Sequence, residues 1–328
     1  MKKFITAAIA ATISLSGASC AFAQQTTESV DSNGMEIPTV YFIKNITPEN
    51  LVKIYKALGS EAHGRVGVKI STGESQQTNY LDPNLMKPLV QSLNGTFIEC
   101  NTAYKGVRMD TKDHEKAIKE RGFLEVAPVD IMDAEGEIKL PVSNGYHLPY
   151  DIVGKDFDNY DYMLVLSHFK GHQMGGFGGA LKNISIGIAS TDGKTFIHTA
   201  GKTANHEELW GNLPEQDDFT ESMADACQGV VNHIGKRNVA YINVANKLSV
   251  DCDCNAHPEA PQMGDLGIFA SLDPVAVDRA CVDAVYNSTD PGKVHLIERI
   301  ESRKGTHILD AAEHNGLGTQ KYRLVVIE

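Results

Sequence analysis

The sequence of 328 residues predicts an α/β protein with a mostly parallel sheet, helices on both faces and a small β-rich excursion. Two observations carry this prediction. Short apolar segments of strand length alternate with segments whose apolar residues recur at helical spacing. The connections between them are short, which is typical of parallel strands with helices packed on the sheet. The composition, 42% hydrophobic and 22% charged, is that of a globular chain and excludes a disordered one.

Helix-start signals mark the first half of the chain. Thr47 precedes Pro48, and Asp82 precedes Pro83, which is the order of an N-cap residue and a first helical residue. In chain order, the predicted elements are a strand over Val40–Ile43, a helix from Thr47 to Leu58, a strand over Val66–Ile70, a helix from Asp82 to Leu93, a strand over Thr96–Glu99 and a helix over His114–Arg121.

The β-rich excursion follows, between Leu124 and Pro149, where strand-like pieces occur without helices. The alternation then resumes, and Asp273 before Pro274 gives another cap signal. The elements predicted here are strands over Tyr162–Leu166 and Asn238–Val244, helices over Phe219–Ile234 and from Asp273 to Tyr286, and a closing strand over Tyr322–Ile327. We expect one α/β domain over residues 40–328.

The N-terminus has the three parts of an export signal. Lys2 and Lys3 are followed by an apolar stretch over 4–15 and by the cleavage pattern Ala21-Phe22-Ala23. We therefore expect a signal peptide over 1–23, a mature chain that begins at Gln24 with a flexible leader over 24–39, and a periplasmic or secreted protein. The apolar stretch is too short to cross a bilayer comfortably, so no stable membrane span is expected after cleavage.

Charge and cysteine content narrow the partners. With 30 basic against 42 acidic residues, the formal net charge is −12, which argues against nucleic acid as the main partner. Cys20 leaves with the signal, and the remaining cysteines are odd in number, so at least one thiol stays unpaired or binds something. Cys227 and Cys281 lie on apolar helix faces and are expected in the core, whereas Cys100, at a strand end, fits either role.

Polar loops follow four of the predicted parallel strands, and such loops meet at one edge of a sheet. We therefore expect one cleft around Glu74, Asn101, Arg108, His168 and Cys252. The predicted site residues are Glu74, Lys170 and Lys182 for catalysis, Asn101, Tyr104, Arg108, Gly175, Gly176 and Asn183 for substrate binding, and His168, His172, Cys252 and Cys254 for metal binding.

Each of these groups has an alternative. The histidines, lysines and glycines of 168–183 suit an anionic substrate or a metal, or form a structural turn with solvated histidines. Arg108 suits a carboxylate or phosphate, or belongs with Asn101, Tyr104 and His114 to a network that only fixes the start of a helix. Glu74 could be a general base, but one carboxylate is weak evidence.

Cys252 and Cys254, separated by one residue, leave three possibilities open. Two thiolates can ligate a soft metal, zinc or iron, with His257 or Asp265 as further partners. They can close a tight disulfide after export, or remain free thiols. Their spacing excludes a thioredoxin motif, which needs two intervening residues.

Three segments carry a family resemblance: His168-Phe-Lys-Gly-His172, the glycines that follow it up to Leu181-Lys-Asn183, and Gly267-Ile-Phe-Ala-Ser-Leu-Asp-Pro-Val-Ala-Val-Asp278. Over residues 40–328 the chain resembles the family called domain of unknown function 362 (DUF 362), whose members are often labelled iron–sulfur centre proteins. Many relatives have an insertion with two Cys-x-x-Cys-x-x-Cys sets. Residues 203–218 contain no cysteine here, so the resemblance implies no in-chain iron–sulfur cluster.

Two hypotheses about function follow. The first is a metal-dependent protein, with a possible redox partner, that acts on a small anionic compound. The second is a binding module of the periplasm that holds a metal or ligand without turnover. An open coordination position beside a pocket would favour the first, and a saturated four-ligand site the second.

Overall fold

The computed structural model describes residues 30, 36–74 and 79–328. Within them, eight strands form one sheet in the order β12-β1-β11-β10-β7-β2-β3-β4. These strands are β1 (Thr39–Ile43), β2 (Val66–Lys69), β3 (Thr96–Glu99), β4 (Val129–Ile131), β7 (Tyr162–His168), β10 (Val239–Ala245), β11 (Gly267–Ser271) and β12 (Arg323–Val326). The predicted signal peptide lies outside the described residues, and β1 begins at Thr39, the last residue of the predicted leader.

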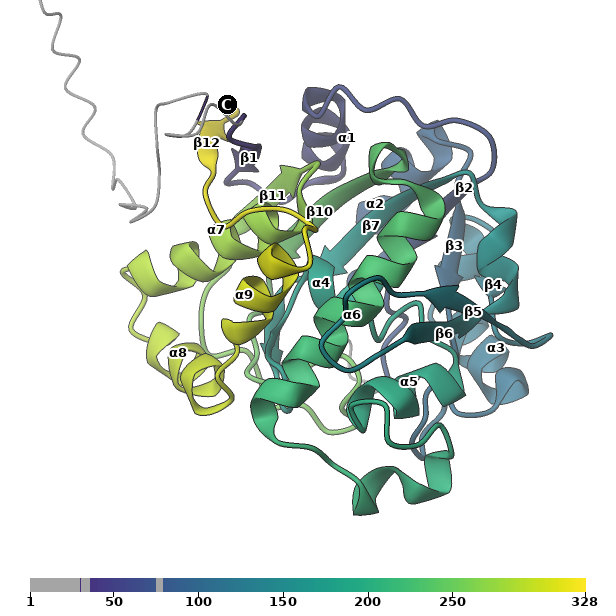
Figure 1. Ribbon diagram of the computed structural model, residues 1–328. Coiled ribbons are helices and arrows are strands. Elements are labelled where there is room, and N and C mark those ends of the chain that lie inside the picture. Colours follow the sequence, from purple (N-terminus) through teal and green to yellow (C-terminus); the bar gives the residue numbers. More distant parts are fainter. Residues whose placement is uncertain (1–29, 31–35, 75–78) are drawn as a thin grey trace, which may run out of the picture.

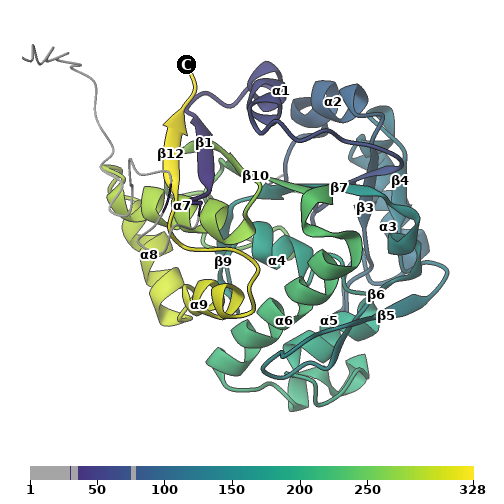
Figure 2. The ribbon, with the colours of Figure 1, turned by 45° about the horizontal axis from the view of Figure 1, so that its top comes forward.

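Helices cover both faces of this sheet, as predicted (Figure 1). On one face lie α1 (Pro48–Ala57), α2 (Pro83–Ser92) and α3 (Thr111–Glu120). On the other lie α4 (Ala180–Ile184), α5 (Thr191–His198), α6 (Gln216–Ile234), α7 (Pro274–Asn287), α8 (Lys293–Ser302) and α9 (His307–His314). Figure 2 shows α1 and α2 across the sheet from α4 and α6. Each face has its own apolar core, because the sheet separates two clusters of buried side chains.

The predicted helix starts are confirmed in the backbone. Thr47 and Asp82 accept hydrogen bonds from Asn50 N (3.2 Å) and Asn84 N (2.9 Å). Asp273 accepts two, from Val275 N and Ala276 N at 2.9 Å. These bonds satisfy amide groups that have no partner inside the first turn of a helix.

One strand was missed. The segment Gly267–Ser271, which we used only as part of the family resemblance, is β11, and it pairs antiparallel with both β1 and β10. Among the described strands of the large sheet, the remaining neighbours pair in parallel. The five residues of β11 are all buried, so they form a continuous apolar run that does not alternate as a half-exposed strand would.

The excursion holds a two-stranded antiparallel sheet of β5 (Glu137–Pro141) and β6 (Tyr150–Gly154). β4, which we placed in the excursion, is instead an edge strand of the large sheet. The glycine-rich segment after β7 also departs from a plain loop, since β8 (Lys170–His172) and β9 (Gly176–Gly178) form a hairpin.

Of the three possibilities left open for Cys252 and Cys254, the structure has the disulfide, whereas we had named both as metal ligands. Cys252 and Cys254 are joined by a disulfide, and Cys100, Cys227 and Cys281 are free and buried. Cys227 and Cys281 lie in the apolar core, as predicted. Burial raises the pKa of all three free thiols well above the usual range, so they are inert at neutral pH.

None of the helices described here combines the length and the apolar composition that crossing a membrane requires.

Candidate functional site

The loops after β2, β3, β7 and β10 meet at one edge of the sheet, which confirms that part of the geometric prediction. Glu74 N donates to Asp253 O at 2.6 Å. His168 Nδ1 lies 3.1 Å from Asp253 Oδ1, and Arg108 Nε lies 2.9 Å from Glu74 Oε2. Residues up to 180 positions apart in the chain are thus joined by direct hydrogen bonds, because parallel strands all end at this edge.

Arg108 and Glu74 belong to a buried ion-pair network. Arg108 pairs with Glu74 and also with Glu99, whose Oε1 lies 2.5 Å from Arg108 Nη1. Burial alone would raise the pKa of Glu99, but Arg108 and His114 hold it well below the usual range. Glu74 also accepts a hydrogen bond from Val107 N. Both Glu74 oxygens are therefore occupied, and neither Glu74 nor Arg108 lines a cavity at this edge.

Asn101 has the structural role that we kept as the alternative. Its side chain donates to Thr111 Oγ1 at 2.8 Å and lies 3.1 Å from His114 Nδ1. His114 in turn contacts Glu99. This network fixes the start of α3. Tyr104 differs, because it lines a cavity.

Two small cavities lie side by side at this edge. The inner one, about 30 Å³, is lined by Ser71, Ser167, His168, Lys170, Gly178, Gly179, Lys182, Asn183, Cys252, Asp253 and Cys254. The outer one, about 160 Å³, is lined by Tyr104, His172, Gln173, Met174, Lys182, Ile186, His198, Trp210, Cys254, Asn255 and Ala256. Lys182 and Cys254 line both. The predicted glycines, Gly175 and Gly176, line neither, whereas Gly178 and Gly179 line the inner cavity.

Lys182 is a cation without a protein partner. Its Nζ has no hydrogen bond or ion pair with any residue that the structure describes. Burial first, and then Lys170, Arg108 and Lys69, lower the pKa of Lys182 to about 7. The position of Lys182 on α4 is fixed by Asp278, which accepts from Ala180 N at 2.7 Å and Leu181 N at 2.9 Å.

Lysines outnumber their counter-charges around the inner cavity. Lys69 lies in β2 and donates to Asn183 Oδ1 at 3.1 Å, and its burial lowers its pKa to about 8. Lys170 pairs with Asp253 at 2.8 Å. Among the residues that the structure describes, Asp253 is the single carboxylate that lines this cavity, so the excess of positive charge favours an anion there.

His168 is not among the residues that could hold a metal. Its Nδ1 contacts Asp253, and its Nε2 lies 2.6 Å from Asn246 O, so both ring nitrogens are used. His168 and Lys170 instead anchor Asp253, whose pKa they lower against the opposing effect of burial. Asp253 stands between the two cysteines in sequence, so this pairing positions the disulfide.

His172 faces the disulfide with one ring nitrogen. Its Nδ1 accepts hydrogen bonds from Met174 N (3.2 Å) and Gly175 N (2.8 Å). A neutral imidazole that accepts at Nδ1 carries its proton on Nε2. That nitrogen lies 3.9 Å from Cys254 Sγ. Burial lowers the pKa of His172 well below its usual range, so the ring is neutral at pH 7.

His172, Cys252 and Cys254 form a possible metal-ligand group, with donor atoms within 4.8 Å of one another. Zinc and iron both accept thiolate and imidazole ligands. In the form seen here the donors do not fit an ion, because the two sulfurs are bonded to each other and Nε2 carries a proton. Reduction of the disulfide, and a change of His172 tautomer, would have to come first.

Sequence reasoning missed several residues of this site. Lys69 was hidden inside an apolar strand, and Asp253 was passed over as the residue between two cysteines. His198, which lines the outer cavity, lies in a helix that we did not predict. A charged side chain within an apolar strand such as Val66–Ile70 was the available signal for Lys69.

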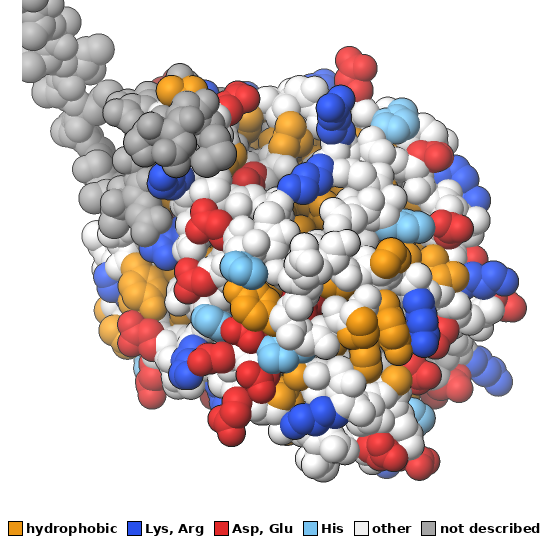
Figure 3. Space-filling model, in the orientation of Figure 1, with side chains coloured by type: hydrophobic (Ala, Val, Ile, Leu, Met, Phe, Trp, Pro, Cys, Tyr) orange, Lys and Arg blue, Asp and Glu red, His pale blue; other side chains and the backbone are white. Residues whose placement is uncertain are grey.

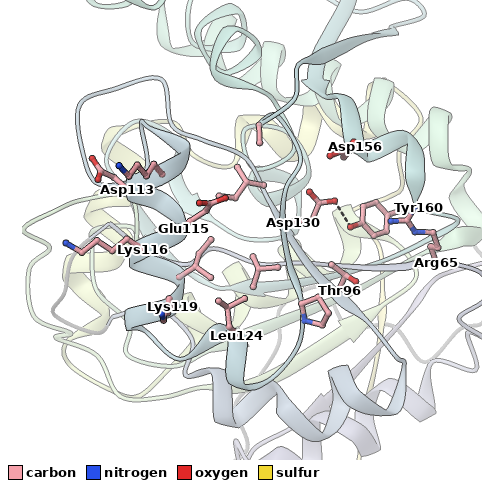
Figure 4. A pocket seen from close by; sticks show the side chains of 16 residues that line it. Arg65, Thr96, Asp113, Glu115, Lys116, Lys119, Leu124, Asp130, Asp156 and Tyr160 are labelled. Carbon is pink, nitrogen blue, oxygen red and sulfur yellow. Dashed lines mark hydrogen bonds between the residues drawn. The ribbon is translucent and has the colours of Figure 1, made fainter.

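A larger hollow of the described surface lies elsewhere. It has a volume of about 860 Å³ and is open, beside α3 and the edge strand β4. Figure 4 shows Asp113, Glu115, Lys116 and Lys119 around its rim, and the hydrogen bond from Tyr160 to Asp130 at 2.7 Å. It contains none of the predicted site residues, and its charged rim side chains are solvated. Size alone does not mark the functional site here.

The fold and site together define a class: an α/β protein whose sheet edge holds a cationic cavity and a disulfide. The chain belongs to the family described as domain of unknown function (DUF362), whose sequence profile matches residues 66–283. The resemblance found in the sequence is thereby confirmed. No curated protein matches the chain.

Two solved structures are similar over part of their length. One is the lactate racemase apoprotein from Thermoanaerobacterium thermosaccharolyticum, with 16% identity and a TM-score of 0.34, covering 62% of this chain and 50% of that one. The other is a protein from Thermotoga maritima, with 14% identity and a TM-score of 0.40, covering 72% of this chain and 56% of that one. The chain thus spans half of the first structure and 56% of the second, and neither likeness bears on its activity.

Proposed function

We propose that this protein carries out thiol–disulfide exchange with a small anionic compound, using Cys252 and Cys254 as its redox pair. One observation supports this above the others: Cys254 and Lys182 line both cavities. A sulfur and an unpaired cation therefore face the same small space. The cavities, about 30 and 160 Å³, are well below the roughly 300–1,000 Å³ of drug-sized pockets, so the compound is small.

The exchange step uses groups that are already in place. In the reduced form, Cys254 loses its proton to solvent and its thiolate attacks one sulfur of a small disulfide, and the first thiolate that departs takes a proton from solvent. The neutral His172 keeps its Nε2 proton, which points to the Cys254 sulfur at 3.9 Å. The Cys252 thiol then attacks the mixed disulfide at Cys254, and its proton passes to the second departing thiolate. Two electrons move from the cysteine pair to the compound, and the Cys252–Cys254 disulfide results. A dithiol protein would reduce it again.

A positive charge beside the thiol supports this chemistry, because a nearby cation favours the thiolate. The proposal keeps the small anionic compound and the redox partner of the sequence hypothesis, and it makes the protein an enzyme.

Metal binding is the second candidate function. It is supported by the closeness of His172, Cys252 and Cys254, and their three donors would leave a fourth position for a ligand.

A lysine substitution tests the anion preference. The reduced protein is mixed with dithiodiglycolate, an anionic disulfide, or with the neutral bis(2-hydroxyethyl) disulfide, and the two rate constants are compared. We expect the anionic probe to react faster by about tenfold, since one favourable contact to a charged group contributes about 1.5 kcal/mol or more. Lys182→Met should remove this preference, because it removes the unpaired cation.

The ratio of the two rates also predicts a pH dependence. Because the pKa of Lys182 is lowered to about 7, its charge is present below pH 7 and lost above it. The preference should therefore fall as pH rises through 7, while thiolate formation affects both probes alike. Lys202→Met, at an exposed lysine, is the matched control. Equal rates for both probes with the wild type would refute the anion site.

We also propose that the protein is exported, on the evidence of the pattern over residues 1–23. Export would deliver the cysteine pair to an oxidising compartment. The intact mass of the secreted protein should correspond to a chain that begins at Gln24. Retention of residues 1–23, or a lipid on Cys20, would contradict this.

A further inference from the structure

A second group of potential ligands lies on the surface, away from the cysteines. His147 belongs to the loop between β5 and β6, Asp218 and Glu221 to the first turns of α6, and His307 begins α9. Figure 3 shows histidine and acidic side chains gathered on this face, where Figure 1 places α9 and the lower part of α6. Three segments that are distant in sequence thus contribute imidazoles and carboxylates to one place.

Glu221 lies between the two imidazoles. Its Oε2 is 2.7 Å from His147 Nε2, and its Oε1 is 3.0 Å from His307 Nε2. Asp218 Oδ1 is 3.9 Å from His147 Nε2, and Asp218 shares a face of α6 with Glu221 because they are three residues apart. The side chains are 17–45% exposed, so an ion can reach them from solvent.

The supports of this group are buried and rigid. Asp225, fully buried on α6, accepts hydrogen bonds from the backbone nitrogens of Tyr146, His147 and Leu148 at 2.7–2.9 Å. It also accepts one from Asn315, directly after α9, at 2.9 Å. A single carboxylate therefore holds both the loop of His147 and the end of α9 against α6. The ligands are positioned before any ion arrives, which lowers the cost of binding.

We propose that His147, His307, Glu221 and Asp218 bind one zinc ion. In a tetrahedral site with bonds of about 2.0–2.1 Å, ligand atoms lie about 3.3 Å apart. The donor atoms of His147, Asp218 and Glu221 lie within 4.8 Å of one another. His307 Nε2 lies 3.0 Å from the other Glu221 oxygen, so the His307 side chain must move towards this group to complete the site. Two imidazoles with two carboxylates suit zinc better than calcium or magnesium, which prefer oxygen alone.

The tautomers open to His147 and His307 also permit zinc binding. Neither His147 nor His307 makes a hydrogen bond through Nδ1 to any residue that the structure describes. The ring proton can therefore lie on Nδ1 of each histidine, which leaves Nε2, now within hydrogen-bond distance of Glu221, to bind the ion. His172 differs in this respect, since its Nδ1 already accepts from the backbone.

Four protein ligands would saturate the ion, which is the pattern of structural zinc. The site would tie α9 and the β5–β6 loop to α6. This inference is independent of the proposed function, because it shares no residue with the cysteine site.

The test uses the full-length protein without an affinity tag and with Cys252→Ser and Cys254→Ser, so that no thiolate of this pair competes. After removal of metal with a chelator, Zn²⁺ is titrated against a chromophoric competitor. We expect one zinc per chain. Glu221→Gln and His307→Gln should each weaken binding by at least about 100-fold, since even outer residues of metal sites contribute 10–100-fold.

His233→Gln is the matched control, because His233 forms a surface pair with Asp158 (2.9 Å) and belongs to no group of potential metal ligands among the described residues. It should leave zinc affinity unchanged. Circular dichroism of the metal-free variants checks that each is folded. Failure to bind zinc at micromolar concentrations, or wild-type affinity in folded Glu221→Gln, would overturn the proposal. Neither result would affect the thiol reaction, which is measured separately.

Discussion

Replacing Arg108 with Met should lower the free energy of unfolding by about 3–5 kcal/mol, the cost of leaving buried charges without their partner. Arg108 and its two carboxylates, Glu74 and Glu99, have side chains only 3–4% exposed. Without the guanidinium, Glu74 and Glu99 would stay in a site that cannot hydrate them. Urea unfolding of both proteins measures the difference. Lys105→Met, three residues away and exposed, is the control and should change stability by less than about 0.5 kcal/mol.

The same substitution predicts a change with pH. In the wild type the pKa of Glu99 is depressed, so its pairing contributes stability above the usual carboxyl range and loses it as pH falls through the folded pKa. In Arg108→Met burial would dominate and raise the pKa of Glu99, so that acid relieves the unpaired charge. The stability difference between the two proteins should therefore be smaller at pH 5 than at pH 8. A difference that is constant with pH would contradict the ion-pair account.

Cys254→Ser should abolish thiol–disulfide exchange, and Cys252→Ser should stop it half-way. Cys254 is partly exposed and lines both cavities, whereas Cys252 is 2% exposed and lines only the inner one. The attacking sulfur is therefore that of Cys254. With Cys252→Ser, the mixed disulfide between Cys254 and the probe cannot be resolved, and it should accumulate to one adduct per chain. Mass spectrometry before and after reduction detects it.

The opposite pattern, with an adduct on Cys252 in Cys254→Ser, would reverse the two assignments.

The double substitution Cys252→Ser with Cys254→Ser tests metal binding, the second candidate function of the pair. If the reduced wild type binds zinc or iron through these sulfurs, that metal should be absent from the double variant while the fold remains. Affinity in the wild type should fall below about pH 6, because the ligands must be deprotonated. No metal in the reduced wild type would leave exchange as the function of the pair.

Local signals in the chain were reliable where the structure depends on local contacts. The caps at Thr47, Asp82 and Asp273 bond to amides two or three residues away, so the sequence contains everything they need. Helix α3 begins at Thr111, earlier than our His114, because Asp110 caps it by accepting from Lys112 N. The buried strand β11 was missed, since its place between β1 and β10 depends on partners that both lie more than 20 residues earlier in the chain.

The sequence predicted where the site lies but not what each of its side chains contacts. That Lys170, Lys182, Asn183 and Cys254 gather at one edge followed from the order of strands and loops. The contacts that each side chain makes did not follow from that order. Arg108 binds Glu99, at the end of the strand that precedes it, and Glu74, which follows the neighbouring strand β2, and this pairing occupies groups that looked free for a substrate.

The sequence by itself determined the alternation of strands and helices, the family, the edge at which the polar loops collect and the pair Cys252 and Cys254. Only the tertiary structure decided that these cysteines are bonded, that His168 anchors Asp253 while His172 faces the sulfur, and that Lys182 has no partner among the described residues. The physical reason is that periodicity and capping depend on neighbours in the chain. Charge pairing and burial depend instead on which distant segments come within a few ångströms of one another.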